Sequence, residues 1–205
     1  TQYQERDVEF LARLAREYHH SFKIVGNQLV FTDKDELGQT EPVAVLDETQ
    51  CISIRLRDRI KDTAKQVEIK GFDTSGKKVV KKSKKAKALR PKMKQAQAAS
   101  GDTLKITTRG ESQEQIDARG DAALSEQNED QSAGDITLIG NPKLVAGSTI
   151  LLKNLGVFSG KYLIKQSRHS ISRTQGYITN IEVRMLEFIP DDLLTLGMEI
   201  TNANT

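Results

Sequence analysis

The sequence predicts a mainly β protein with a few α-helices, organised as two barrel-like antiparallel β segments. Short runs in which apolar and polar residues alternate predict the strands. Turns rich in Gly, Pro, Asn and Ser separate these runs in the last third, as in a small barrel or sandwich. Two segments instead have the apolar spacing of a helix. The expected division is 1–72 for the first β segment with its helix, 73–102 for a basic loop or linker, 103–188 for a helix and the distal barrel, and 189–205 for a tail.

The first expected element is an amphipathic helix near the start of the chain. Its apolar stripe is Val8, Leu11, Leu14, Ala15 and Tyr18, with charged residues on the other side. A hairpin follows, in which Gly26-Asn27 joins the runs 22–25 and 28–31, because this dipeptide tolerates the positive φ of a tight turn. The polar segment 32–41 is predicted to be a loop.

Two further strands are expected in the first half. Ile52, Ile54 and Leu56 alternate with polar residues, and so do Val67 and Ile69. We interpret both runs as half-buried antiparallel strands. Cys51 is expected to be a small core residue, since a single cysteine cannot form an internal disulfide.

Between Lys77 and Lys94 the sequence is strongly basic and contains no acidic residue. Such a stretch is predicted to be a solvated loop without a core. Two functional alternatives remain: contact with nucleic-acid phosphates, which would be independent of sequence and sensitive to salt, or docking on an acidic face of a neighbouring subunit. The candidate contact residues are Lys77, Lys78, Lys81, Lys82, Lys84, Lys85, Lys87 and Arg90.

The last part of the chain begins with a helix and continues with strands. Ser112 and Gln115 have the spacing of a capping box, which predicts a helix to about Gln127 with Ile116, Gly120, Ala123 and Leu124 on its apolar face. Small residues on that face predict close packing against a sheet. Four strands follow, and their inward residues are expected to be Ile136, Leu138, Ile150, Leu152, Tyr162, Ile164, Ile181, Val183 and Met185.

The sequence offers no candidate for catalysis and none for a metal or cofactor. The histidines His19, His20 and His169 are not spaced as ligands or as part of a triad, so a structural role is expected for them. The carboxylates between Asp117 and Asp130 are interpreted as the solvated face of the second helix. A cell-wall hydrolase would need paired carboxylates in a cleft, so no enzyme is expected. The apolar runs are too short to span a bilayer.

The turn motifs of the last third resemble those of the late control D family of phage tail baseplate hub proteins, which is related to the hub part of the type VI secretion spike protein VgrG. They are Gly140-Asn141-Pro142, Ala146-Gly147, Phe158-Ser159-Gly160-Lys161-Tyr162, His169 and Gly176-Tyr177-Ile178-Thr179. The acidic helix at residues 5–14 resembles the start of the family's middle segment. The family places a histidine at the end of a strand where His169 lies, so the resemblance implies that His169 is a hydrogen-bonding barrel residue. Residues 65–110 match no motif of the family.

The resemblance implies a structural protein with a hub-type fold, in which three copies form a ring. It would join the tail tube protein to the central spike protein in the virion tail baseplate, after synthesis in the host bacterial cytoplasm, and DNA would pass through its channel. The segment 52–57 and the apolar tail are candidate subunit contacts; the tail residues are Phe188, Ile189, Leu193, Leu194 and Leu196. Because family members carry a preceding domain, the chain is expected to be part of a longer hub. The alternative function is a sequence-independent nucleic-acid-binding module that acts through the lysine-rich segment.

Overall fold

The computed structural model describes residues 2–59, 61, 63–73, 76–86, 102–110 and 112–194. They form two compact units, each drawn from separate stretches of the chain. The first unit contains the described residues up to Glu36, from Lys61 to Ala86 and from Asp102 to Glu129; the second contains the rest. Strands outnumber helices in both units, which confirms the mainly β class with a few helices.

The first unit begins with a helix and a hairpin, as predicted. Helix α1 (Asp7–Glu17) turns its small residue Ala15 inward. Strands β1 (His20–Val25) and β2 (Gln28–Asp33) then pair antiparallel around Gly26-Asn27, with Gly26 at φ +59°. That left-handed backbone conformation is the reason for glycine at this turn.

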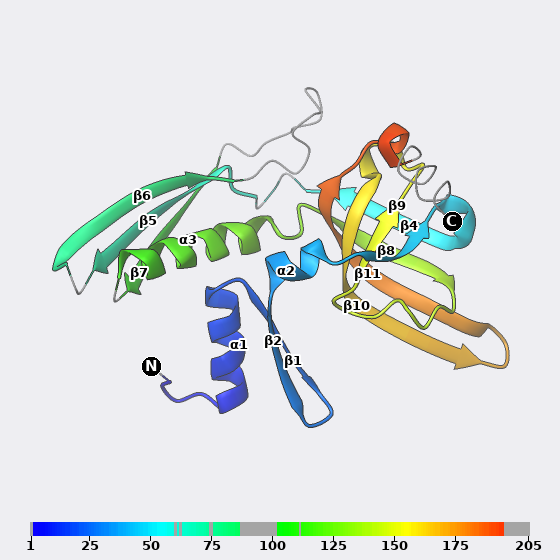
Figure 1. Cartoon of the computed structure of the whole chain (residues 1–205), viewed down its shortest axis with the longest axis horizontal. Coiled ribbons are helices and arrows are strands. Elements are labelled where there is room, and N and C mark those ends of the chain that lie inside the picture. Colours follow the sequence, from blue (N-terminus) through cyan, green and yellow to red (C-terminus); the bar gives the residue numbers. More distant parts are fainter. Residues whose placement is uncertain are drawn as a thin grey trace. The chain divides into compact units, whose positions relative to one another are not determined.

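A three-stranded sheet covered by one helix forms the core of the first unit (Figure 1). The strand order is β6 (Lys78–Lys85), β5 (Gln66–Asp73) and β7 (Thr103–Gly110), and helix α3 (Gln113–Asn128) packs on one face. The Ser112 side chain accepts a hydrogen bond from the Gln115 N–H at 3.4 Å, as the predicted cap requires. Strands β5 and β7 are parallel, a pairing that alternation along one strand cannot reveal. The buried core residues are Ala64, Val67, Ile69, Val80, Ile116 and Leu124.

Two glycines bring α3 very close to β5. A Cβ atom at Gly120 would lie 1.9 Å from Cδ1 of Ile69, and one at Gly71 would lie 2.7 Å from Cδ1 of Ile116. Each isoleucine therefore fills the space that a side chain on the facing glycine would need. The predicted close approach through small residues is confirmed.

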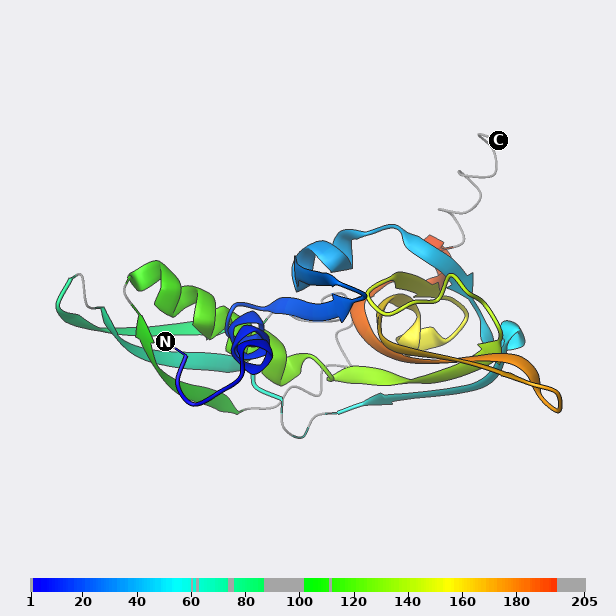
Figure 2. The same cartoon turned by 90° about the horizontal axis from the view of Figure 1, so that it is seen from below.

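The second unit is a six-stranded sheet that curls into a half-barrel (Figure 2). Its order is β3 (Pro42–Leu46), β9 (Thr149–Leu152), β10 (Gly160–Ser172), β11 (Gly176–Phe188), β8 (Ser132–Ile139) and β4 (Cys51–Asp58). All nine residues expected to face inward from the last third are buried in one core. Two strands from the first half, β3 and β4, form the edges of this sheet, and β3 pairs parallel to β9.

Turn motifs in the last third have clear structural reasons. Gly160 has φ +145° and Gly176 has φ +71°, conformations that favour glycine. At Gly140 a Cβ would lie 2.0 Å from the ring of Tyr177, so the ring occupies the space above the glycine. His169 Nδ1 lies 2.9 Å from the Tyr177 hydroxyl and 3.1 Å from Thr179 Oγ1. These contacts confirm His169 as a hydrogen-bonding residue of the half-barrel.

Two predictions about the first half were wrong. Residues 32–41 are not a loop, because β2 continues to Asp33 and helix α2 (Lys34–Gln39) follows. The Asp33 carboxylate accepts the Asp35 N–H at 2.7 Å and so caps that helix. Ile52 is exposed rather than aligned with Ile54, because the register between β4 and β8 shifts between Cys51 and Ser53. Such a bulge changes the face on which a side chain lies.

Cys51 packs against the core of the second unit, as predicted. Burial, followed by the charge of Asp47, raises the pKa of its thiol above the usual range. The thiol is therefore a weak nucleophile, in keeping with a packing role.

Candidate interaction surfaces

Residues Lys78–Lys85 of the lysine-rich segment form a regular strand, β6, where the sequence predicts a loop. Val80 of β6 is buried under α3, and Lys82 and Lys84 extend along the same face. Their amines form ion pairs with the α3 carboxylates Asp117 and Asp121, respectively. The prediction of a solvated loop was therefore wrong for this strand, and so was that of a purely solvated acidic face on α3. The lysine stems cover apolar surface while the helix supplies the counter-charges.

The other face of the same sheet is also basic but lacks such partners. Lys81 and Lys85 of β6, Lys70 of β5 and Lys105 of β7 are exposed there. None of these four forms an ion pair with another residue that the structure describes. We call these four lysines the basic face.

The remaining candidate phosphate contacts lie at the end of the strand or beyond it. Lys77 is exposed in the turn before β6 with φ 50°, and Lys78 is exposed at the strand's first position. Lys87 and Arg90 lie outside the described residues. The six described candidates, which are close together in the sequence, thus lie in different environments in the structure.

The hairpin β1–β2 presents an exposed apolar surface that the sequence analysis did not identify. Phe22 lies opposite Phe31, and Ile24 lies opposite Leu29, so all four side chains share one face. Ile24 is 52% exposed, Leu29 62% and Phe31 45%. A two-stranded hairpin is marginally stable by itself, and clustered exposed apolar residues mark contact sites. The sequence did carry a signal for this surface: apolar residues at alternate positions of both hairpin strands, which pairing around Gly26-Asn27 places on one face.

The predicted tail contacts are divided between core and surface. Phe188 packs against the core of the half-barrel, and Leu194 is 8% exposed. Ile189 is half-buried, and Leu193 is exposed. Leu196 lies outside the described residues. On the other candidate segment, Ile52 is exposed on the edge strand β4.

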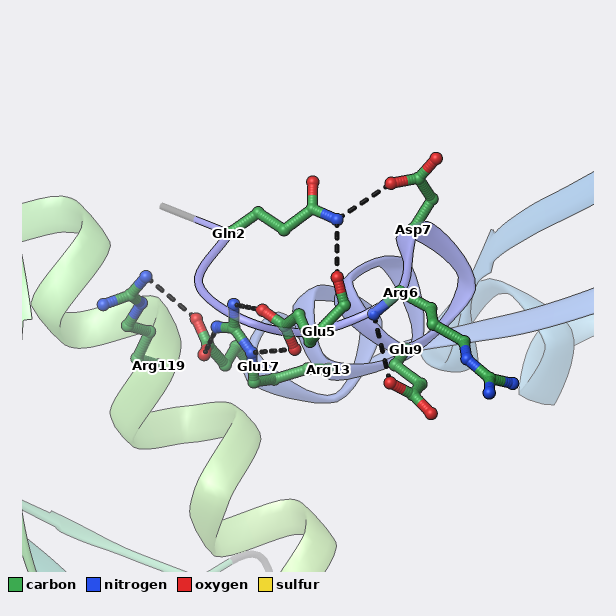
Figure 3. Close-up of polar contacts among 8 residues, drawn as sticks. All are labelled: Gln2, Glu5, Arg6, Asp7, Glu9, Arg13, Glu17 and Arg119. Carbon is green, nitrogen blue, oxygen red and sulfur yellow. Dashed lines mark hydrogen bonds and ion pairs between the residues drawn. The ribbon is translucent and has the colours of Figure 1, made fainter.

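A chain of ion pairs ties the beginning of the protein to α1 and α3 (Figure 3). The Arg13 guanidinium donates to Glu5 at 2.6 Å and to Glu17 at 2.7 Å, and Glu17 also pairs with Arg119 at 2.9 Å. Arg119 lies over the ring of Tyr18, 5.4 Å from its centroid. The adjoining cleft has a volume of about 330 Å³. Arg13 and Arg119, two of the residues that line the cleft, are thus already paired with carboxylates.

This network makes a prediction about pH. The hydrogen bond from Arg13 holds the pKa of the Glu5 carboxyl below its usual range. A lowered folded-state pKa stabilises the protein above the unfolded-state pKa, about 4.3 for glutamate, and the contribution is lost as the pH falls through the folded-state value. We expect Glu5→Gln to have a lower melting temperature than the wild type at pH 7, and the difference to shrink as the pH falls below about 4.3 and through the lowered folded-state pKa.

The control for this prediction is Glu41→Gln, which removes an exposed carboxylate from outside the network. Its melting temperature should follow that of the wild type at every pH. A Glu5→Gln deficit that does not shrink as the pH is lowered from 7 would contradict the assignment, because protonation of the wild-type carboxyl should remove it.

The described residues contain no group of three or more His, Cys, Asp and Glu side chains placed to hold a metal ion. Glu129 pairs with Lys34, and Asp130 pairs with Lys165. The other ring nitrogen of His169, Nε2, lies 3.1 Å from the Leu144 carbonyl oxygen.

In the part of the chain that the structure describes, no helix is long and apolar enough to cross a membrane. The surfaces above are therefore the features from which a function can be argued.

No protein-family model matches the sequence, and no curated protein matches it. The fold, however, is similar to solved structures of tail proteins. The tail protein from Neisseria meningitidis MC58 aligns with a TM-score of 0.62 and 14% identity, over 91% of this chain and 56% of that one. The 43 kDa tail protein of prophage MuSo2 from Shewanella oneidensis aligns with a TM-score of 0.62 and 16% identity, over 94% and 57%.

A chain in the virion of a native gene transfer agent particle is also similar, with a TM-score of 0.50, 18% identity and coverage of 88% of this chain and 39% of that one. The chain thus spans a little over half the length of the two tail proteins. At these identities the similarity shows the fold, which this chain shares with phage tail proteins.

Proposed function

We propose that the protein is a structural component of the baseplate hub of a phage tail or phage-like injection particle. In this role it joins the tail tube protein to the central spike protein as a homotrimer. The observation that carries the proposal is the fold, which matches two tail proteins over more than nine-tenths of this chain. The turn motifs of the half-barrel, which resemble those of the late control D hubs, support the hub in preference to other components of a tail.

The apolar face of the hairpin is the proposed subunit contact. Ile24, Leu29 and Phe31 expose apolar surface on a hairpin that has little stability of its own. Burial against another copy would remove this surface from water, at roughly 25 cal/mol per Å². In a closed ring each copy offers one surface to the next, so a hairpin docked on the neighbouring subunit is compatible with threefold symmetry. The edge strand β4 and Leu193 remain proposed additional contacts.

The role is proposed to be non-enzymatic. The described carboxylates that the sequence singled out, such as Asp117, Asp121 and Glu129, are engaged in ion pairs with lysines. An acid–base pair needs carboxylates whose pKa values are separated by their environments and that converge on a substrate site. The exposed surfaces instead support assembly.

Light scattering coupled to size exclusion would test the subunit contact. We expect the wild type to have three times the 22.8 kDa mass of the chain. The double variant Ile24→Lys/Leu29→Lys should be a monomer, because it places charge in the contact. The matched control Ile139→Lys/Ile171→Lys changes two other exposed apolar residues and should remain a trimer. A hairpin variant with the wild-type mass would contradict the proposed contact.

The hub assignment itself is tested in assembled particles. An antibody against the protein should label the distal end of the tail tube, next to the spike. Labelling along the tube or at its head-proximal end would contradict a hub role, whatever the mass in solution.

A further inference from the structure

We infer that the basic face of the β6–β5–β7 sheet binds duplex DNA through the phosphate backbone, without regard to base sequence. This inference goes beyond the hub role and does not depend on it. It assigns the contact to Lys70, Lys81, Lys85 and Lys105, only two of which are among the lysines that the sequence pattern selected.

The strand register places these lysines on one surface. Lys70 is paired with Lys81 across β5 and β6, and Lys85 lies four positions further along β6 on the same side. On the other side of β5, Lys105 of β7 is paired with Glu68 of β5. With strands about 4.8 Å apart and about 3.4 Å per residue, the four amines are distributed over an area on the order of 10 by 13 Å. Among the side chains that the structure describes on these three strands, Glu68 is the one carboxylate on this face, so the basic charge predominates.

The two faces of β6 differ in how their charge is balanced. Towards α3, Lys82 and Lys84 are each neutralised by an aspartate of the helix. On the opposite side, Glu68 of β5 is the one acidic residue beside the four lysines among the side chains that the structure describes on these strands. The fold therefore leaves an excess of positive charge on the outward face.

This arrangement is unfavourable in the isolated protein. Like charges directly opposite each other on neighbouring strands are destabilising, and Lys70 and Lys81 form such a pair. A bound polyanion would remove the repulsion. Binding of an anion would therefore explain why the free protein has lysines that repel each other on this face.

The composition of the face favours DNA over an acidic protein partner. Lysine is depleted at protein–protein interfaces, whose binding energy is concentrated in buried aromatic and arginine anchors. The large apolar residues of this face, Phe72 and Val79, lie opposite each other at one end and leave the lysines without an anchor between them. A phosphate backbone, in contrast, needs only positive charges placed along it. Single-strand binding uses several stacking aromatics, and the described residues of this face offer Phe72 alone, so the duplex is favoured.

Fluorescence anisotropy with the full chain and a labelled 25-base-pair duplex tests the inference. We expect binding at about 50 mM salt with equal affinity for two unrelated duplex sequences. Four phosphate contacts predict a slope of about −3.6 for log K against log salt, so affinity should fall about 100-fold between 50 and 200 mM. The variant Lys70→Gln/Lys81→Gln/Lys85→Gln/Lys105→Gln should lose more than tenfold in affinity at 50 mM and most of the slope.

Two further variants separate a binding face from net charge and from misfolding. Arg57→Gln/Lys143→Gln/Arg168→Gln/Arg173→Gln removes the same charge from exposed positions of the second unit and should bind like the wild type. Replacing the four lysines of the basic face with arginine keeps the charge and should retain binding; circular dichroism would verify the fold of each variant. Equal losses in the glutamine variant and the charge-matched control would overturn the inference. So would salt-insensitive binding, or tighter binding of a glutamate-rich peptide than of DNA at equal charge, which would indicate an acidic protein as the partner.

Discussion

Replacing Gly134 with alanine is expected to lower the free energy of unfolding of the second unit by about 3 kcal/mol. A Cβ atom at this position of β8 would lie 1.9 Å from the carbonyl oxygen of Arg55 and 2.9 Å from the Cα atom of Leu56, both in the backbone of β4. A flexible side chain could rotate away, but a strand held in a ladder cannot. The alanine would therefore separate β4 from β8 or distort both strands.

Gly38→Ala is the matched control, since it makes the same chemical change in the same unit. The nearest atom to a Cβ there is Cδ1 of Leu186 at 3.5 Å, which is an ordinary contact, and the residue lies within α2. Alanine should stabilise this position by about 0.5–1 kcal/mol, because it loses less conformational entropy in a helix. Urea unfolding followed by circular dichroism would measure both variants. A Gly134→Ala variant as stable as the wild type would contradict the close contact of β4 and β8.

Replacing Gly120 with leucine is expected to destabilise the first unit by about 3 kcal/mol, because α3 would be pushed off the sheet. The Cβ alone would lie 1.9 Å from Cδ1 of Ile69, whose side chain is 1% exposed. The isoleucine is enclosed on all sides, so it cannot move aside without disturbing the core around it.

A compensating change makes this prediction specific. Ile69→Ala alone should cost about 2–5 kcal/mol by leaving a cavity under α3. In the double variant Gly120→Leu/Ile69→Ala, the leucine occupies part of that cavity, so the total loss should be smaller than the sum by about 1–2 kcal/mol. Denaturant unfolding of the four proteins gives this coupling energy. Additive losses would show that the two residues do not share the same space.

Much of the half-barrel could be predicted from the sequence because its strands follow a local rule. Inward residues such as Ile136, Ile181 and Val183 alternate with polar ones, and a strand with one buried face must show this period. Glycine is favoured where φ is positive, as at Gly176, and this too is a local property. For the same reason the Gly26-Asn27 hairpin and the capped helix α3 lie where the sequence predicts them.

Contacts between residues distant in sequence decided the rest. Residues Lys78–Lys85 form a strand because they pair with β5 and bury Val80 under α3. Lys82 and Lys84 also pair with Asp117 and Asp121, which lie 35 and 37 residues away, and no local pattern encodes these contacts. The bulge that exposes Ile52 depends on the register between β4 and β8. The candidate surfaces depend on tertiary structure for the same reason: the sequence alone determined which residues are basic or apolar, and only the packing of α3 on one face of its sheet decided which lysines are neutralised and which face the solvent.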